Sequence, residues 1–333
     1  MRVVVADPPA FTPPYDHELA AALARAGADV ELATSRFRFG DAPVPDGYRR
    51  RELFYPLSSR LFRRSRLRLP LKVLEHPFGM ARLATAAADV VHVQWLGLPE
   101  ADAWLLRTRA PLVFTAHDLL PRRTARKEGL WRRLFGRFER IVVHSQRGRE
   151  TLASFGVPEE KLRVIPHPVT PSEPARGGHG RTVLALGLVR PYKQLDQARD
   201  AVSRVDGAEL RVAGDSHRFL PESEIDRALA ESTVAVFPYR AELDQSGALL
   251  RALGAGLPAV VYDVGGLAEP VRAFGAGRVV APDDVDGLAA ALQELLDDEA
   301  ALASARAGAM RARAELTWAA SAQAHLDLYR ELL

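Results

Sequence analysis

Short apolar runs alternate with amphipathic stretches along both halves of the chain. The runs are rich in Val, Ile and Leu and mostly lack polar alternation, so they predict parallel strands that are covered on both faces. The predicted strands are residues 3–6, 30–33, 90–93, 112–115, 141–144 and 162–165, then 183–187, 209–213, 234–237, 259–262 and 278–280. Several stretches between them have helical periodicity, among them residues 18–26, which Gly27 ends as a C-cap.

Repeated strand–helix units predict the fold class: α/β, with two Rossmann-like, doubly wound parallel-sheet domains facing a central cleft. A Pro/Gly-rich stretch without hydrophobic periodicity, residues 171–180, predicts a linker and places the domain boundary after residue 170. Residues 318–333 predict one more amphipathic helix. Because ligands of such sheets bind beyond the carboxyl ends of the strands, the loops that follow the strands are the first candidates for chemistry.

The charge divides at the same point as the strand pattern. Residues 1–170 carry 28 basic and 18 acidic side chains, a net charge of +10, whereas residues 171–333 carry 17 and 24, a net charge of −7. The overall charge of +3 hides this difference. Such asymmetry favours an anionic partner for the basic half.

Composition narrows the class of protein further. A chain of 333 residues that is 47% hydrophobic and 26% charged is typical of a globular protein and excludes fibrous and disordered classes. The absence of cysteine excludes disulfides, thiolate metal sites and cysteine nucleophiles. No apolar run approaches the ~18 residues of a membrane span, and the first apolar run is too short for a signal peptide. We therefore expect a cytoplasmic protein.

Two loops of the second half suit an anion. Strand 234–237 leads through a polar loop into Gln245-Ser246-Gly247 and a helix, whose first N–H groups and positive dipole end attract phosphate. Ser246 can donate to phosphate or simply cap the helix.

The other loop follows strand 183–187. It presents Gly187, then Arg190 as a bidentate fork and Lys193 as a point charge. A lone pair of loop cations is usually only solvated, but the two loops together predict one diphosphate clamp.

Polar residues also end strands in the first half. His117 and Asp118 follow strand 112–115 and could orient hydroxyl groups or stabilise a leaving phosphate, although a loop histidine often only bonds backbone. Ser145 is expected to cap helix 146–155. The further candidates are His17, for which capping by Asp16 is the alternative, and His92, Gln94 and His144.

Other site types lack their motifs. Asp284 and Asp286 open an Ala/Leu-rich helix and are interpreted as caps, so no metal site is predicted. The dinucleotide, P-loop, zinc-protease and serine-hydrolase signatures do not occur.

With these loops identified, the chain resembles the retaining, GT-B-fold glycosyltransferases of family four, in an AspGlnSerGly-type variant of the donor motif. The matching segments are residues 117–121, 142–145, 164–166, 187–193, 212–215, 244–247, 256–258 and 264–269. The resemblance implies a nucleoside diphosphate-sugar donor on domain 171–315 and an acceptor on domain 1–170. It further implies that the helix at 316–333 returns to the first domain, and that neither a metal nor a cofactor is needed.

The positions of these residues at strand and helix ends, together with the resemblance, give them expected roles. The implied catalytic residues are His117, Asp118, Arg190 and Lys193; the donor-binding residues are Gly187, Gly214, Asp244, Gln245, Ser246, Gly247 and Glu269; the acceptor-binding residues are His17, His92, Gln94 and His144.

The sequence departs from the family at two places. Leu243 and Arg251 stand where the family commonly has two glutamates, and an arginine cannot accept hydrogen bonds from ribose hydroxyls. Residues 7–14 replace the usual glycine-rich loop.

A basic, apolar stretch lies between residues 57 and 74. It holds six cations and no acid, interleaved with Leu, Phe and Val, and residues 122–140 add eight cations against two acids. Such a surface can dock on anionic lipid at the inner membrane, the alternative being a solvated arginine-rich surface. Nucleic acid is not expected, because no nucleic-acid-binding module accompanies the charge.

The expected function is metal-independent transfer of a sugar, with retention, to a sugar, glycolipid or small-molecule acceptor. A sugar-nucleotide epimerase or phosphorylase of the same fold, and a catalytically silent GT-B partner subunit, are the alternatives.

Overall fold

The computed structural model describes residues 1–37, 42–61, 66–120, 124–170, 180–216, 220–240 and 245–333. These residues form two compact units, the first made of Met1–Ile165 with Trp318–Leu333 and the second of Pro166–Thr317. The division therefore falls just before Pro166, whereas the sequence pattern places it after residue 170. Most of the predicted linker, residues 171–179, lies outside the described residues.

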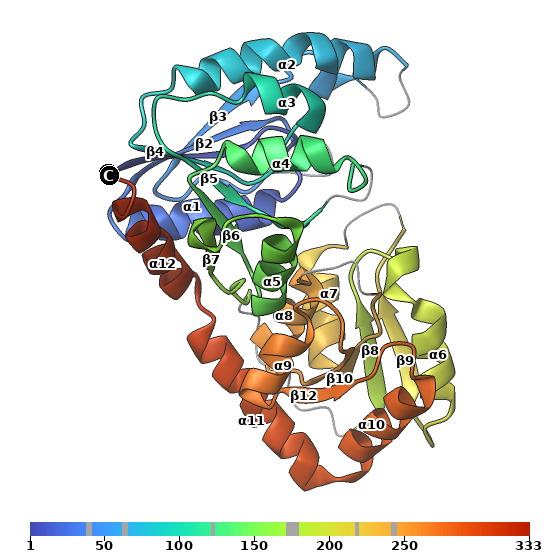
Figure 1. Cartoon of the computed structure of the whole chain (residues 1–333). Helices are drawn as coiled ribbons and strands as arrows, with labels where there is room; N and C mark the ends of the chain where they lie inside the picture. Colours follow the sequence, from blue (N-terminus) through green and yellow to red (C-terminus); the bar gives the residue numbers. More distant parts are fainter. Residues whose placement is uncertain (38–41, 62–65, 121–123, 171–179, 217–219, 241–244) are drawn as a thin grey trace. The chain divides into compact units, whose positions relative to one another are not determined.

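The first unit is built on a parallel sheet of seven strands in the order β3-β2-β1-β4-β5-β6-β7 (Figure 1). Every neighbouring pair of its strands is parallel. The strands are β1 Arg2–Asp7, β2 Asp29–Ser35, β3 Arg49–Phe54, β4 Val90–Val93, β5 Leu112–Thr115, β6 Arg140–Val143 and β7 Leu162–Val164.

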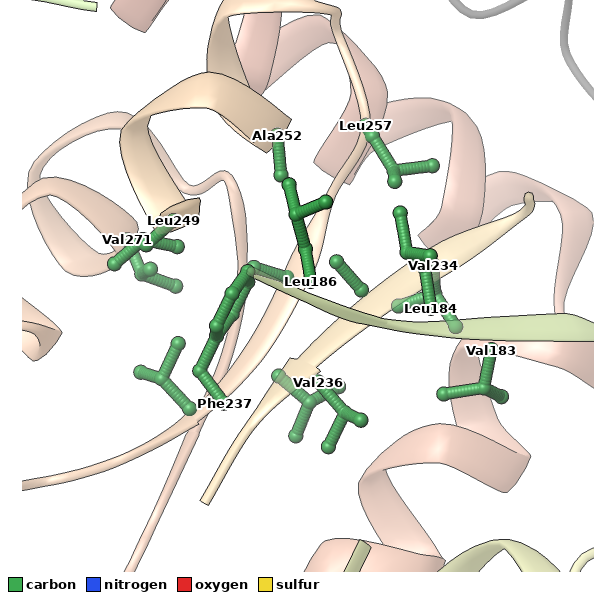
Figure 2. Close-up of a cluster of buried hydrophobic side chains, with 14 of the residues drawn as sticks. Val183, Leu184, Leu186, Val234, Val236, Phe237, Leu249, Ala252, Leu257 and Val271 are labelled. Atoms are coloured by element: carbon green, nitrogen blue, oxygen red, sulfur yellow. The ribbon is translucent and has the colours of Figure 1, made fainter. Parts of the chain in front are cut away.

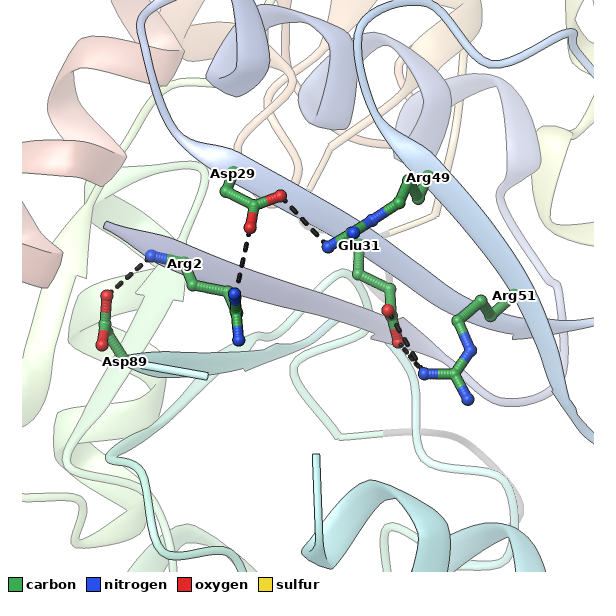
Figure 3. Close-up of polar contacts among 6 residues, drawn as sticks. All are labelled: Arg2, Asp29, Glu31, Arg49, Arg51 and Asp89. Atoms are coloured by element: carbon green, nitrogen blue, oxygen red, sulfur yellow. Dashed lines mark hydrogen bonds and ion pairs between the residues drawn. The ribbon is translucent and has the colours of Figure 1, made fainter. Parts of the chain in front are cut away.

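The apolar pattern does not predict β3, which is the edge strand of this sheet. Its first residues are three arginines, and charged side chains are typical of edge strands that must not pair with other chains. Figure 3 shows how the neighbouring strand β2 neutralises two of them: Arg49 pairs with Asp29 at 3.2 Å and Arg51 with Glu31 at 3.1 Å. Part of the positive charge of the first half is therefore balanced within the sheet.

Helices cover both faces of this sheet, as a doubly wound fold requires. Val3 and Val5 of β1 belong to the core beneath α1 Pro13–Arg25 and α12 Trp318–Arg330. Val4 and Ala6 belong to the core on the other face. The helices of that face are α2 Arg68–Ala84, α3 Pro99–Leu105, α4 Glu128–Gly136 and α5 Gln146–Phe155.

The chain's final helix, α12, packs on the first unit. Its Tyr329 is buried and its hydroxyl lies 2.6 Å from Nδ1 of His92 on β4. Trp318 meets the ring of Tyr15 on α1 edge to face, with 5.1 Å between centroids. α12 thus completes the core over one face of the seven-stranded sheet.

The second unit holds a parallel five-stranded sheet in the order β12-β11-β10-β8-β9. Val236 and Phe237 of β10, Leu186 of β8 and Leu249 of α8 belong to its core (Figure 2). The strands are β8 Thr182–Leu186, β9 Glu209–Ala213, β10 Val234–Phe237, β11 Ala259–Tyr262 and β12 Gly277–Val280. The helices are α6 Leu195–Ser203, α7 Glu222–Ala230, α8 Gly247–Gly254, α9 Ala268–Phe274, α10 Val285–Asp297 and α11 Glu299–Glu315. The prediction of two parallel-sheet α/β domains is confirmed.

Local signals at the helix ends give mixed results. Gly27 has φ +93° after α1, Ser145 accepts the Gly148 N–H at 2.8 Å, and Asp284 accepts the Gly287 N–H at 2.8 Å, so these three predicted caps are confirmed. The capping role considered for Asp16 is wrong. Because α1 begins earlier, at Pro13, Asp16 lies inside the helix and is buried.

Candidate functional site

The two loops predicted as a diphosphate clamp meet at the carboxyl edge of the second sheet. Gly187 directly follows β8 with φ +91°, a left-handed conformation that favours glycine. A Cβ on Gly187 would lie 2.9 Å from Nζ of Lys193 and 3.4 Å from Cβ of Ala248, in the first turn of α8. The geometry thus brings Lys193 and the start of α8 to the same glycine.

Lys193 ends the 3₁₀ turn η3 Pro191–Lys193 and points back over the sheet edge. Its Nζ donates to the carbonyl of Leu186 at 3.0 Å and lies 5.2 Å from the centre of the Tyr239 ring. Burial, with a smaller effect from Arg190, lowers the pKa of Lys193 to about 8. A desolvated ammonium held by a backbone carbonyl is well suited to bind an anion.

The start of α8 offers helix-terminal N–H groups beside this ammonium. Ser246 is the N-cap, and its Oγ accepts the Leu249 N–H at 3.3 Å, while Gly247 is exposed. Gln245 donates from Nε2 to the Gly266 carbonyl at 3.2 Å and accepts the Ser246 N–H at 3.1 Å. Ser246 and Gln245 therefore hold the helix start in place, with the Leu249 N–H taken up by the cap, and Gly247 and Ala248 contribute helix-terminal N–H groups that no carbonyl of the helix accepts.

The remaining donor-side candidates occupy different places around this edge. Arg190 donates to the carbonyl of Ser216 at 2.6 Å, which fixes it to the loop after β9. A Cβ on Gly214 would lie 2.1 Å from the Gly187 carbonyl oxygen, so Gly214 allows the two loops to pack closely. Glu269 is half-buried in the first turn of α9, and Asp244 lies outside the described residues.

In the first unit, His117 lies within a cluster of polar and aromatic residues. Its Nε2 is 2.9 Å from Oε1 of the buried Gln94, and its ring stacks on Trp95 at 5.1 Å between centroids. Tyr15 of α1 meets the same ring edge to face at 4.7 Å. Asp118 is exposed beside it. His117 is therefore fixed in orientation while remaining partly accessible.

His144 contacts the ring of His117 and helps to fix its orientation. Its Nδ1 is 3.0 Å from the carbonyl of Ile165, and its Nε2 is 3.4 Å from Nδ1 of His117. Burial lowers the pKa of His144 to about 4, so the ring is neutral at pH 7 and its Nδ1 donates to the carbonyl. Nε2 of His144 is then an acceptor for His117.

Two of the predicted acceptor residues do not belong to this cluster. His92 is fully buried, its Nδ1 is hydrogen-bonded to the Tyr329 hydroxyl, and its Nε2 lies 2.7 Å from Oγ1 of Thr115. Neither nitrogen is therefore available to bind an acceptor substrate, and the expected acceptor-binding role of His92 is corrected. Such burial lowers the pKa of His92 well below its usual value. The Nδ1 of His17 lies 3.0 Å from the Tyr48 hydroxyl. His17 is two positions after Tyr15 in α1, and residues two positions apart in a helix do not share a face, so His17 lies on a different face of α1 from Tyr15.

Sequence reasoning missed the aromatic residues of both clusters. Tyr239 lies beneath the Lys193 ammonium, and Trp95 and Tyr15 enclose His117. Trp95 directly follows a strand, which is a signal that could have identified it. Tyr15 lies in a stretch, residues 13–17, that the sequence pattern does not assign to a helix.

Two family models match the chain, one on each half. Residues 15–173 match the model described as Glycosyltransferase Family 4, and residues 180–298 match Glycosyl transferases group 1. Over its whole length the chain is similar to a solved sucrose-phosphate synthase from Thermosynechococcus elongatus, with a TM-score of 0.77, 20% identity and 99% of that chain covered. Each half of the chain thus carries a glycosyltransferase domain, and the whole chain has the GT-B fold.

Further solved structures share the fold of this glycosyltransferase. HepE of Anabaena, in complex with UDP-glucose, superposes with a TM-score of 0.73 at 16% identity, and all of both chains is covered. WaaG, a glycosyltransferase involved in lipopolysaccharide biosynthesis, gives 0.65 at 16% identity over 98% of this chain and 99% of its own.

One curated relative is similar to part of the glycosyltransferase. It is an exopolysaccharide phosphotransferase of Streptomyces coelicolor, 28% identical over 190 residues, which is 49% of this chain. The match takes in 20% of the relative's length, so the chain spans about a fifth of that protein.

Two features of the glycosyltransferase's loops bear on its chemistry. Arg251 of α8 is held by Glu222 and, at 3.1 Å, by Asp226 of α7, so its charge is compensated inside the second unit. In the loop after β1, Oδ2 of Asp7 accepts the Phe11 and Thr12 N–H groups at 2.7 and 3.2 Å. This carboxylate takes over the shaping of a loop that lacks glycine.

No described helix of the glycosyltransferase combines the length and the apolar character that crossing a bilayer requires.

Proposed function

We propose that this glycosyltransferase moves a sugar, with retention and without a metal ion, from a nucleoside diphosphate-sugar to an acceptor. The observation that carries the proposal is the convergence of Lys193, Gly187 and the start of α8 at one sheet edge. A desolvated ammonium and helix-terminal N–H groups stabilise the charge that develops on a departing diphosphate, the largest charge change of such a transfer.

Each side chain of the second unit has a proposed task in this step. Lys193 contacts the diphosphate as a point charge, and Arg190 adds a second cation from the adjoining loop. The N–H groups near Gly247 bind phosphate oxygens. Glu269 and Asp244 are proposed to bind donor hydroxyls. HepE was solved with UDP-glucose, which makes a UDP-sugar the first donor to test.

On the acceptor side we propose roles for His117 and Asp118. Gln94 and His144 each hold one ring nitrogen of His117, so its ring is fixed in one orientation beside the sugar or acceptor, and a hydroxyl group that hydrogen-bonds Nε2 shares or replaces the Gln94 contact. Trp95 and Tyr15 shield the ring from water on two sides. The acceptor is a sugar, glycolipid or small molecule of polysaccharide or glycoconjugate synthesis, and the enzyme works in the cytoplasm, at the inner membrane surface when its acceptor is a lipid.

A thermal-shift panel of nucleoside diphosphates and their sugars tests the donor proposal. The expected result is a rise in melting temperature with one base, larger for the sugar-nucleotide it belongs to. NMR of the product's anomeric proton then tests retention, and full activity in a chelator tests metal independence. No shift with any nucleotide at millimolar concentration contradicts the proposal.

That negative outcome favours a catalytically silent subunit. The observation behind this second candidate is Arg251, whose position does not supply a ribose-binding carboxylate and whose charge is already held by Glu222 and Asp226. A sugar-nucleotide epimerase is distinguished by product analysis, since it converts a labelled donor without any acceptor.

A further inference from the structure

The long helix α2 of the first unit exposes several large apolar side chains to solvent. Leu67, just before it, and Leu69, Val73, Leu74 and Phe78 within it are exposed to 72%, 61%, 50%, 68% and 71%. On its inner side, Met80 and Leu83 are buried in the core together with a histidine, His76. The apolar stripe of a surface helix normally faces the core, so α2 carries an additional apolar face on its solvent side.

The polar side chains of α2 are engaged by the protein itself. Lys72 donates to the Gly97 carbonyl at 3.2 Å, and Glu75 accepts the Leu57 and Ser58 N–H groups at 2.6 and 3.0 Å. Both charged side chains therefore bond to neighbouring loops, and the exposed surface of α2 beside them consists of leucine, valine and phenylalanine side chains.

A buried hydrogen-bond chain fixes this orientation. Nδ1 of His76 lies 2.7 Å from the Tyr55 hydroxyl, and its Nε2 lies 2.6 Å from Oδ1 of Asp102, whose Oδ2 accepts the Leu98 N–H at 2.9 Å. The side chains of Tyr55, His76 and Asp102 are all buried. Rotating α2 to hide its leucines would break these bonds and leave buried polar groups unpaired, at a high free-energy cost.

Positive charge borders the apolar face. Residues 57–84 contain seven cations and only one acid, Glu75, and Arg60 and Arg66 are exposed beside the start of α2. Apolar side chains bordered by cations complement the surface of an anionic bilayer. The apolar side chains insert at the boundary of the acyl chains, and the cations are attracted to the negatively charged headgroups.

We propose that the outward face of α2 docks the enzyme on an anionic lipid bilayer, with Leu74 and Phe78 inserted and Arg60 and Arg66 at the headgroups. This inference assigns the membrane contact proposed above to the outward face of α2, and its biological role rests on the proposed function. Lipid binding is measured without a sugar-nucleotide, so its failure leaves the sugar-transfer proposal standing, and the reverse also holds.

The test is flotation of the full chain with phosphatidylcholine vesicles that contain or lack phosphatidylglycerol, at low and high salt. Binding is expected only with phosphatidylglycerol and is expected to weaken with salt. The double variant Leu74→Ser/Phe78→Ser should weaken partitioning by about tenfold or more, as should Arg60→Gln/Arg66→Gln. Val44→Ser, an exposed apolar residue elsewhere in the first unit, and Arg25→Gln on α1 are the matched controls and should bind like the wild type.

A second readout separates insertion from electrostatic adsorption. Phe78→Trp adds an exposed fluorophore whose emission should shift to the blue on anionic vesicles and be quenched by brominated lipid. Equal binding to both vesicle types, wild-type binding by the double variant, or no added quenching in the Phe78→Trp variant on bound vesicles would overturn the proposal. A concentration-dependent dimer that Leu74→Ser/Phe78→Ser abolishes would assign the face to a second copy instead, and would also overturn it.

Discussion

Lys193 shows how a binding site can oppose stability at the scale of one residue. Its ammonium is largely withdrawn from water, and among residues 166–317 it is the only lysine. Burial disfavours the charged form, so the folded chain holds this lysine at a lower pKa than the unfolded chain does. A group that weakens the fold when charged is expected where charge is needed for function.

The substitution Lys193→Met should therefore separate activity from stability. Turnover should fall at least tenfold, about 1.4 kcal/mol or more of lost transition-state stabilisation, while the melting temperature at pH 7 stays equal or rises. Steady-state kinetics and calorimetry measure the two effects. Arg199→Ala, an exposed cation on the neighbouring helix α6, serves as the control. Unchanged turnover in Lys193→Met would remove Lys193 from the proposed clamp.

The same ammonium predicts a pH dependence of nucleotide binding. Lys193 is protonated below its pKa of about 8, so nucleoside diphosphate affinity should be highest there and decline as the pH rises through 8. A bound diphosphate raises this pKa, so binding near pH 8 should take up a proton. Titration calorimetry in buffers of different ionisation enthalpy detects that uptake. Lys193→Arg should abolish it, and an equal uptake in this variant would point to another group.

At the scale of elements, α1 carries a buried carboxyl pair with the strand before it. Asp16 hydrogen-bonds Asp7 at the end of β1, and burial raises the pKa of both groups, with the Asp7 charge raising that of Asp16 further. Two carboxylates in one buried place cannot both ionise readily, so the pair is expected to share a proton. The loop between them is folded around this pair rather than around glycines.

This pair predicts the sign of a pH effect on stability. Because the folded pKa of Asp16 is raised, its contribution to stability is present at low pH and is lost as the pH rises through that folded pKa. Asp16→Asn keeps a hydrogen-bond donor and should raise the free energy of unfolding at pH 8 by about 1 kcal/mol or more. Denaturant unfolding at several pH values measures it. A variant that is less stable than the wild type at pH 8 would show that both carboxylates are accommodated.

Elements were predictable from the sequence to the extent that apolar periodicity determines them. Buried strands such as β1 and β10 follow from their valine runs, whereas β3 begins with three arginines and is not apparent as a strand. Helix α2 was missed for the opposite reason. It has exposed leucines on one side and buried Met80, Leu83 and His76 on the other, so the sequence indicated a basic surface without showing which side chains face water.

The residues of the candidate site also differ in whether a local sequence pattern could identify them. Gly187, Lys193 and Ser246 could be identified because glycine, cations and a cap directly follow strands. His92 also ends a strand, yet it is a core residue, because its bonding partner Tyr329 lies far away in the sequence on α12. Partners of that kind depend on the tertiary fold and leave no local signal.

At the scale of the whole molecule, the bond between His92 and Tyr329 joins the two segments of the chain, Met1–Ile165 and Trp318–Leu333, that make up the first unit. Tyr329→Phe removes the hydroxyl and leaves Nδ1 of the buried His92 without its partner, which should lower the free energy of unfolding of the first unit by about 1–3 kcal/mol. Scanning calorimetry should show the loss in one transition only. Tyr48→Phe, at a partly buried hydrogen bond to His17, should have a smaller effect. Equal losses in the two variants would contradict the central role of the buried bond.

The return of α12 to the first unit has a consequence for synthesis on the ribosome. The second unit is continuous from Pro166 to Thr317, and its ends lie side by side, since the Val169 N–H donates to the Leu316 carbonyl at 2.9 Å. It can fold as soon as that stretch has emerged. The first unit begins earlier but waits for residues 318–333 to cover its sheet. The half made first is thus finished last, and until then its apolar sheet face is a natural binding site for a chaperone.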